Sequence, residues 1–146
     1  MRRWWRYAWP AGYSMLGLVL AWCVVACGGW WRLRGGTLEC GGGRLGALAA
    51  RLPPRLRFAA ITLGHVILGT DAATLDAARV HEQVHVRQYE RWGLLFGPAY
   101  LASSGVQLLR GRRPYLDNRF EREAYAVAAR TGAADGDKAA RGAARP

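Results

Sequence analysis

The stretch that decides the fold is residues 71–92, DAATLDAARVHEQVHVRQYERW, which we interpret as one helix. Asp71 or Thr74 is a suitable N-cap for it. Residues four positions apart lie one above the other on a helix, so His81 and His85 direct their rings to the same side. The segment therefore predicts a helix that presents two imidazole rings to a single point.

Glu82 directly follows the first of these histidines and completes an HExxH pattern. On a helix it lies about 100° around from His81, beside an ion held by the two histidines rather than on it. A carboxylate in that position can accept a proton from metal-activated water, which is how HExxH zinc sites divide the work. We expect Zn²⁺ as the cofactor, His81 and His85 as ligands and Glu82 as the catalytic base. The alternative is an amphipathic helix whose histidines are solvated or hydrogen-bonded to neighbours.

A catalytic zinc needs a third protein ligand and one open position. No third histidine follows at the spacing of an HExxHxxGxxH motif. Residues 117–129, DNRFEREAYAVAA, predict a second helical segment that carries Glu121 and Glu123, roughly 35 residues beyond His85. That separation fits a helix, a connector and a returning helix. Both carboxylates are candidates, and only one needs to face the ion.

The order HEQVHVRQ and then FEREAYAVA resembles the gluzincins, zinc peptidases with HExxH and a glutamate on a later helix. The later segment is similar to the E-x-x-A pattern of the membrane-embedded prenyl-protein proteases. This resemblance implies Glu121 as the third ligand and Ala124 as a small packing residue, with Glu123 as the alternative ligand. Tyr125 stands where those enzymes usually carry an aspartate that orients a ligand. Gln88 completes an HExxHxxQ form, which resembles small minimal gluzincin domains of bacteria.

In such domains a strand lies just before the active-site helix, and its edge can pair with a peptide substrate. Residues 60–68, AITLGHVIL, are rich in β-branched side chains and predict a strand in that place. His65 would then lie in the middle of the strand, either packed there or hydrogen-bonded to substrate or to the water on the metal. Gln88 lies on the face of the two histidines and either holds a ligand in place or is a surface residue. The resemblance covers residues 58–130.

The N-terminal run 7–31 carries no charged side chain over about 25 residues and has tryptophan and arginine at both ends. This length and these flanks predict a transmembrane helix. A cleaved signal is the alternative, with MRRWWR as its basic region and VVAC, ending at Cys27, as a lipoprotein processing site. Basic residues nearly balance on the two flanks, so the side of the membrane stays open.

We therefore expect an α+β fold, in which a membrane anchor or signal segment at residues 1–31 precedes a minimal gluzincin-like domain at 32–130. Short strands, the active-site helix, an apolar helix and the ligand helix make up that domain. The uncharged run 94–109 is short for a second span and predicts a buried or interfacial helix. The tail 131–146 is of low complexity and predicts disorder.

The formal charge of +11 comes almost entirely from scattered arginines, and no nucleic-acid motif accompanies them. We therefore expect membrane lipid and a peptide or protein substrate as partners, and no nucleic acid. The predicted function is that of a single-pass, membrane-anchored zinc metallohydrolase of the peptidase type, in which metal-activated water attacks an amide. Two alternatives are a non-catalytic metal-binding or scaffold membrane protein that keeps the HExxH outline, and a lipid-associated structural protein with an incidental motif.

Overall fold

The computed structural model describes residues 5–53 and 59–143. Residues 1–4, 54–58 and 144–146 lie outside the described residues, and they include most of the predicted basic N-terminal region and the end of the predicted tail. In chain order the elements are α1 (Trp5–Ala8), α2 (Ala11–Ala26), β1 (Trp30–Arg34), β2 (Thr37–Gly41), α3 (Gly43–Ala50), β3 (Ala60–Leu63), β4 (Val66–Gly69), α4 (Ala72–Trp92), a short 3₁₀ turn (Gly93–Leu95), α5 (Phe96–Leu109) and α6 (Arg119–Ala143).

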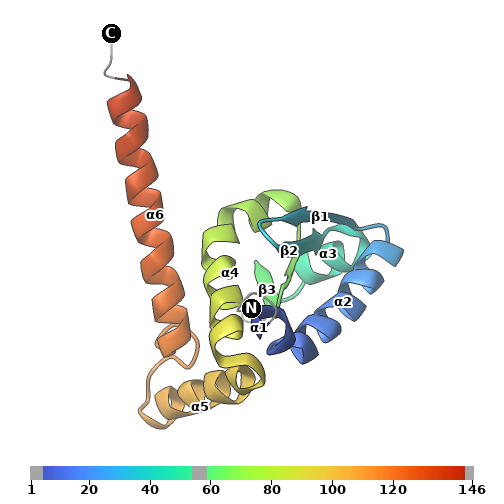
Figure 1. The fold of residues 1–146 in the computed structure, drawn as a ribbon, viewed down its shortest axis with the longest axis horizontal. Helices are drawn as coiled ribbons and strands as arrows, with labels where there is room; N and C mark the ends of the chain where they lie inside the picture. Colours follow the sequence, from blue (N-terminus) through green and yellow to red (C-terminus); the bar gives the residue numbers. More distant parts are fainter. Residues whose placement is uncertain (1–4, 54–58, 144–146) are drawn as a thin grey trace.

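The strands form one mixed sheet in the order β1-β2-β4-β3. The pairs β1–β2 and β3–β4 are antiparallel, whereas β2 and β4 run parallel to each other. Figure 1 shows this sheet between α2 on one side and α4 on the other. The chain is thus a mixed α/β fold with a four-stranded sheet covered on both faces.

The core follows the two-residue period of the strands, since successive side chains point to opposite faces of a sheet. On β4, Val66 packs with Ala21 of α2 on one face. Its neighbour Ile67 packs with Leu75 and Val86 of α4 on the other face. This alternation fixes α4, and with it the HExxH motif, against the sheet.

The predicted single strand AITLGHVIL is wrong, because the structure divides it into β3 and β4. Gly64 lies in the turn between them with φ of 61°, a conformation that glycine adopts without a steric penalty. His65 accordingly lies in the turn and not in the middle of a strand. The hairpin leaves β3 at the edge of the sheet, beside α4.

The predicted fold class and the single-pass membrane location are wrong, because both depended on a spanning helix in residues 7–31. The run is instead divided among α1, the 16-residue α2 and the start of β1. At 1.5 Å per residue α2 is about 24 Å long, less than the roughly 30 Å of a bilayer core. In the described part of the chain, no helix combines the length and the apolar character that crossing a membrane requires.

Packing on the sheet explains why α2 is so apolar. A Cβ added at Gly17 would lie 2.7 Å from Val66 Cβ, so glycine permits the helix to approach β4 closely. Ala21 and Val24, each about one turn further on, are buried on the same side. The opposite side of α2 exposes large apolar side chains, among them Met15 and Trp22. The sequence therefore lacks the polar face that normally identifies a packed helix.

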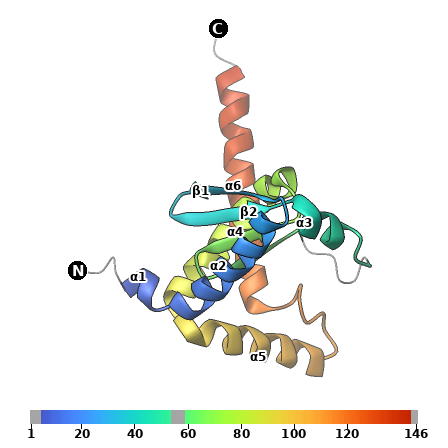
Figure 2. The same ribbon diagram turned by 90° about the vertical axis from the view of Figure 1, so that its right-hand side faces the viewer.

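The two helices that follow α4, α5 and α6, both contact it. The run 94–109 is a helix as predicted, but of α5 only Phe96 is buried among the described residues. Figure 2 shows α5 at the lower end of the molecule and α6 leading away from it past α4. The helix α6 continues through the segment for which composition predicts disorder, as far as Ala143.

Candidate metal centre

The helix α4 carries both histidines of the HExxH motif, as the sequence predicts. It begins after Asp71, whose carboxylate accepts a hydrogen bond from Thr74 N at 2.8 Å, and it ends at Trp92, with Gly93 as its C-cap. His85 is buried, and the side chain of His81 is 11% exposed. Their Nε2 atoms lie 3.1 Å apart. Two imidazole nitrogens therefore converge in a space that is largely shielded from water.

The connector between α5 and α6 brings the chain back to His81 and His85 on α4. Asn118, fully buried, accepts a hydrogen bond from Phe120 N at 2.9 Å and so caps the start of α6. Its amide nitrogen donates to Tyr100 O at 3.0 Å and to Ser104 Oγ at 2.7 Å, both on α5. This asparagine locks the first turn of α6 onto α5. An asparagine just before a predicted helix is a recognised capping signal, so the sequence alone could have indicated this role of Asn118.

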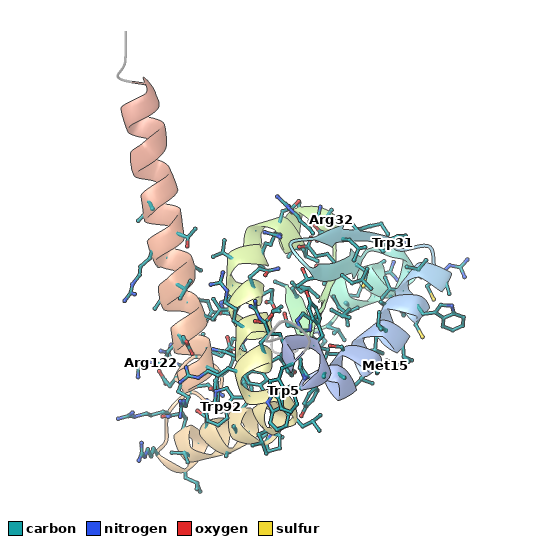
Figure 3. All side chains as sticks on the ribbon, in the orientation of Figure 1. Trp5, Met15, Trp31, Arg32, Trp92 and Arg122 are labelled. Atoms are coloured by element: carbon teal, nitrogen blue, oxygen red, sulfur yellow. The ribbon has the colours of Figure 1, made fainter. Side chains whose placement is uncertain are left out.

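Glu121 lies in the first turn of α6 and is 3% exposed. Its Oε2 is 3.1 Å from His81 Nε2, and its Oε1 is 3.4 Å from His85 Nε2. Potential ligand atoms of the three side chains all lie within 4.8 Å of one another. These distances show that the structure brings together the three predicted ligands from two distant segments. Arg122, next to Glu121 in the chain, lies on the outer side of α6 (Figure 3).

The spacing of these atoms fits a metal ion. A tetrahedral zinc with bonds of about 2.0–2.1 Å separates its ligand atoms by roughly 3.3–3.4 Å. The two histidine Nε2 atoms, 3.1 Å apart, are close to that value. Glu121 approaches them with two different oxygens, Oε2 at 3.1 Å from His81 Nε2 and Oε1 at 3.4 Å from His85 Nε2. Two nitrogen atoms and one carboxylate also form a donor set that divalent transition metals prefer. The group His81, His85 and Glu121 could therefore hold a metal ion.

The hydrogen bonding of Glu121 supports the same conclusion. Tyr100 Oη donates to Oε1 at 2.7 Å, but no described residue donates a well-aligned hydrogen bond to Oε2, which is buried. Burial raises the pKa of this carboxyl group, yet contacts with His81 and His85 outweigh burial and hold it well below its usual range. A buried, ionised carboxylate with an unpaired oxygen is costly unless a cation lies beside it.

Gln88 orients one ligand and also separates the two candidate carboxylates. Its Oε1 lies 2.8 Å from His85 Nδ1, an arrangement that places the proton on Nδ1 and leaves Nε2 free to bind a metal. Its Nε2 donates to Phe120 O at 3.1 Å and to Glu123 Oε2 at 2.9 Å. Glu123 is therefore held by Gln88, whereas Glu121 reaches the two histidines. Gln88 therefore contacts His85, a candidate ligand, as well as Glu123.

Glu82, the predicted base, is 6% exposed and points toward β3. Thr62 Oγ1 donates to Glu82 Oε2 at 2.7 Å. This contact fixes the carboxylate beside the two histidines, on the side of the helix that faces the sheet edge. The role of Thr62 could not be predicted from the sequence, because its contact with Glu82 depends on how the hairpin packs on α4.

The two remaining predicted residues have different surroundings. The ring of Tyr125 lies 4.5 Å from the ring of His81, centre to centre, so it packs on a candidate ligand. His65 lies elsewhere: its Nε2 is 3.3 Å from Glu90 Oε1, and its ring lies 4.5 Å from that of Tyr7. His65 therefore joins the N-terminal segment to α4 and is not brought to the metal centre.

Comparisons of this chain with protein-family models, with curated proteins and with solved structures find no match. Its chemistry must therefore be inferred from the site itself. A large cavity of about 1390 Å³ is lined by the three candidate ligands and by Glu82. A metal ion held there would face a space wide enough for a substrate.

Proposed function

We propose that this chain is a zinc-dependent hydrolase of the peptidase type, similar in its active site to the gluzincins. The observation that carries the proposal is the convergence of His81, His85 and Glu121, whose potential ligand atoms lie within 4.8 Å of one another, with Glu82 in the same cavity. When bound, zinc supplies a Lewis acid that lowers the pKa of a water molecule to about 7 and polarises a carbonyl group.

The residues of the chain divide the remaining work among them. Glu82 accepts the proton of the attacking water and returns it to the leaving amine, as a general base and then a general acid. Thr62 holds one oxygen of that carboxylate at 2.7 Å, which limits its motion. Gln88 and Tyr100 hold His85 and Glu121 in position. These contacts preorganise the site before substrate arrives.

The edge strand β3 supports a peptide as substrate. Within the described part of the chain, β4 is its only strand partner. Residues Ala59 to Leu63 line the cavity over the ligands. An extended peptide can add to such an edge through backbone hydrogen bonds, which would place an amide group over the metal.

The test is the variant Glu82→Gln in the full chain loaded with zinc. The amide keeps the shape of the side chain but cannot act as a base, so we expect unchanged zinc content and a loss of peptide hydrolysis of about 10²–10⁴-fold. Glu90→Gln, on the same helix but paired with Arg6 and His65, is the control and should stay active.

Activity of Glu82→Gln close to that of the wild type would contradict the assigned role. A wild-type chain that binds zinc but cleaves no member of a broad peptide panel would favour the alternative function, a non-catalytic metal-binding protein.

A further inference from the structure

The cavity over the ligands follows the length of α4 and differs at its two ends. Ala77 and Ala78 line it about one turn before His81, and Tyr89 lines it about one turn after His85. The helices α4 and α6 run in opposite directions, because Gln88 contacts Glu123 and His81 contacts Tyr125. Ala128, which also lines the cavity, therefore belongs to the end near Ala77, where small side chains gather. The end beyond His85 is bordered by large ones. A substrate lying along α4 would therefore meet two unlike surfaces on either side of the metal.

The large side chains at the second end form what we call the aromatic pocket, defined by Tyr13, Tyr89, Phe96, Pro98 and Leu101. The ring of Phe96 lies 6.3 Å from that of the ligand His85 and 4.3 Å from that of Tyr89. Tyr13 comes from α2, and its ring lies 4.9 Å from that of Tyr89. Aromatic packing thus continues from a metal ligand to the N-terminal helix.

Tyr13 is held in this position by its surroundings. Its hydroxyl group donates to Leu94 O at 3.4 Å and lies against Gly97, where a side chain would collide with it. Leu101, at the rim of the pocket, is 70% exposed although it lines the cavity. The pocket therefore has a fixed aromatic floor and, at its rim, an exposed apolar residue, Leu101, that a bound group could cover.

The five residues of the aromatic pocket carry no amine, guanidinium or carboxylate group. Burial raises the pKa of the Tyr89 hydroxyl, so this phenol stays uncharged at neutral pH. A charged substrate side chain entering here would lose its hydration without gaining an ionic partner. A bulky apolar side chain would instead be stabilised by the burial of its apolar surface.

We infer that the aromatic pocket binds a bulky apolar side chain, such as phenylalanine or leucine, next to the peptide bond that is cleaved. This inference rests on the proposed function and names its substrate class. Peptides with an internal apolar residue are bound and cleaved in preference to those with a small or charged residue at that position. The difference in kcat/KM between phenylalanine and alanine should be at least about tenfold.

The test uses blocked, fluorescent octapeptides of glycine, serine and alanine with one variable residue: Phe, Leu, Ala, Lys or Glu. Cleavage by the zinc-loaded full chain is followed by fluorescence, and the cleaved bond is located by mass spectrometry. Binding of the same peptides to zinc-loaded Glu82→Gln is measured by fluorescence anisotropy, which needs no turnover.

Leu101→Asp is the diagnostic variant, because an exposed position tolerates the change without unfolding. Leu109→Asp is its control: Leu109 is 89% exposed on the same helix and is not among the residues that line the cavity. We expect Leu101→Asp to remove most of the preference for Phe and Leu, and Leu109→Asp to keep it.

The outcomes separate this inference from the proposed function. Selective binding of the Phe and Leu peptides without cleavage by the wild type would support the pocket and contradict hydrolysis. Cleavage with no preference among the five residues, or an unchanged preference in Leu101→Asp, would overturn the pocket and leave hydrolysis standing. Equal binding of all five peptides and no cleavage would overturn both.

Discussion

Two buried glutamates, Glu39 on β2 and Glu121 on α6, are almost equally inaccessible but differ in their partners. Each oxygen of Glu39 has its own guanidinium donor, Arg32 Nε at 2.7 Å and Arg79 Nε at 2.8 Å. Glu121 instead faces two imidazole rings and keeps one oxygen without a well-aligned donor among the described residues. Complete pairing is what a structural acid requires, whereas incomplete pairing in a closed space indicates a ligand site.

The position of each acid agrees with this reading. Arg32 also reaches Asp76 on α4, so the Glu39 network ties the β1–β2 hairpin to the N-terminal half of that helix. Glu121 lies against the middle of the same helix, where the cavity opens. The Glu39 cluster stabilises the fold that holds α4, whereas the Glu121 cluster could hold a metal ion against the same helix. Substitutions in the two clusters should therefore affect different properties.

Glu39→Ala should have the largest effect on stability. The change leaves the guanidinium groups of Arg32 and Arg79 without their acid. We expect the free energy of unfolding to fall by about 3 kcal/mol. This is the lower end of the range for a broken buried pair, because both arginines reach solvent. Chemical denaturation measures this, and Asp117→Ala, in a surface pair with Arg113, should lose no more than about 1 kcal/mol. A loss of zinc binding in folded Glu39→Ala would remove the distinction between the clusters.

Gln88→Ala should have a smaller effect, confined to the metal. Without its hydrogen bond at 2.8 Å, His85 is free to adopt other orientations and tautomers, and zinc affinity should fall about 10–100-fold. Competition with a zinc chelator measures the affinity. Gln83→Ala is the matched control, since Gln83 is on the same helix but donates to Thr37. Equal affinities in the two variants would mean that Gln88 does not position the ligand.

The smallest expected effect concerns pH. The stability of the metal-free chain should fall as the pH rises, whereas the stabilisation that zinc adds should increase. Burial alone lowers the pKa of His85, but the hydrogen bond and charge of Glu121 raise it above its ordinary value. Because the pKa of His85 is higher in the folded chain than in the unfolded chain, protonation of His85 stabilises the metal-free fold. This stabilisation is complete below the unfolded pKa of about 6.5, and it is lost as the pH rises through the folded pKa. Zinc binding requires the neutral ring and strengthens over the same range.

The melting temperature of the metal-free chain should therefore fall between pH 6 and pH 8, and the stabilisation added by zinc should grow. Thermal unfolding with and without a chelator measures both. If the melting temperatures of the zinc-loaded and the metal-free chain changed in parallel with pH, His85 would not be a ligand.

The sequence was sufficient to predict the local parts of the site. Spacing placed His81, Glu82 and His85 on one helix, and Asp71 was one of the two recognisable caps for its start. The choice between Glu121 and Glu123 was not local. It depends on how Asn118 fixes α6 to α5, a set of contacts that only the folded chain reveals.

The N-terminal run shows why the rest could not be predicted. An apolar helix that packs on a sheet and exposes apolar side chains on its other side has the same composition as a membrane span. Only the partner surface, Val66 opposite Gly17, distinguishes them. The same limit applies to Thr62 and Tyr13, which reach the site from separate elements. Contacts between distant segments leave no periodic signal in a single sequence.

The central claim is that Glu121, with His81 and His85, completes a zinc site. Its most direct test is the zinc content of the purified chain, measured by elemental analysis for the wild type, Glu121→Ala and Glu123→Ala. We predict about one zinc per chain in the wild type and in Glu123→Ala, because three ligands and an open position make a catalytic site, and a large loss in Glu121→Ala. Wild-type zinc content in folded Glu121→Ala, or a greater loss in Glu123→Ala, would contradict the claim.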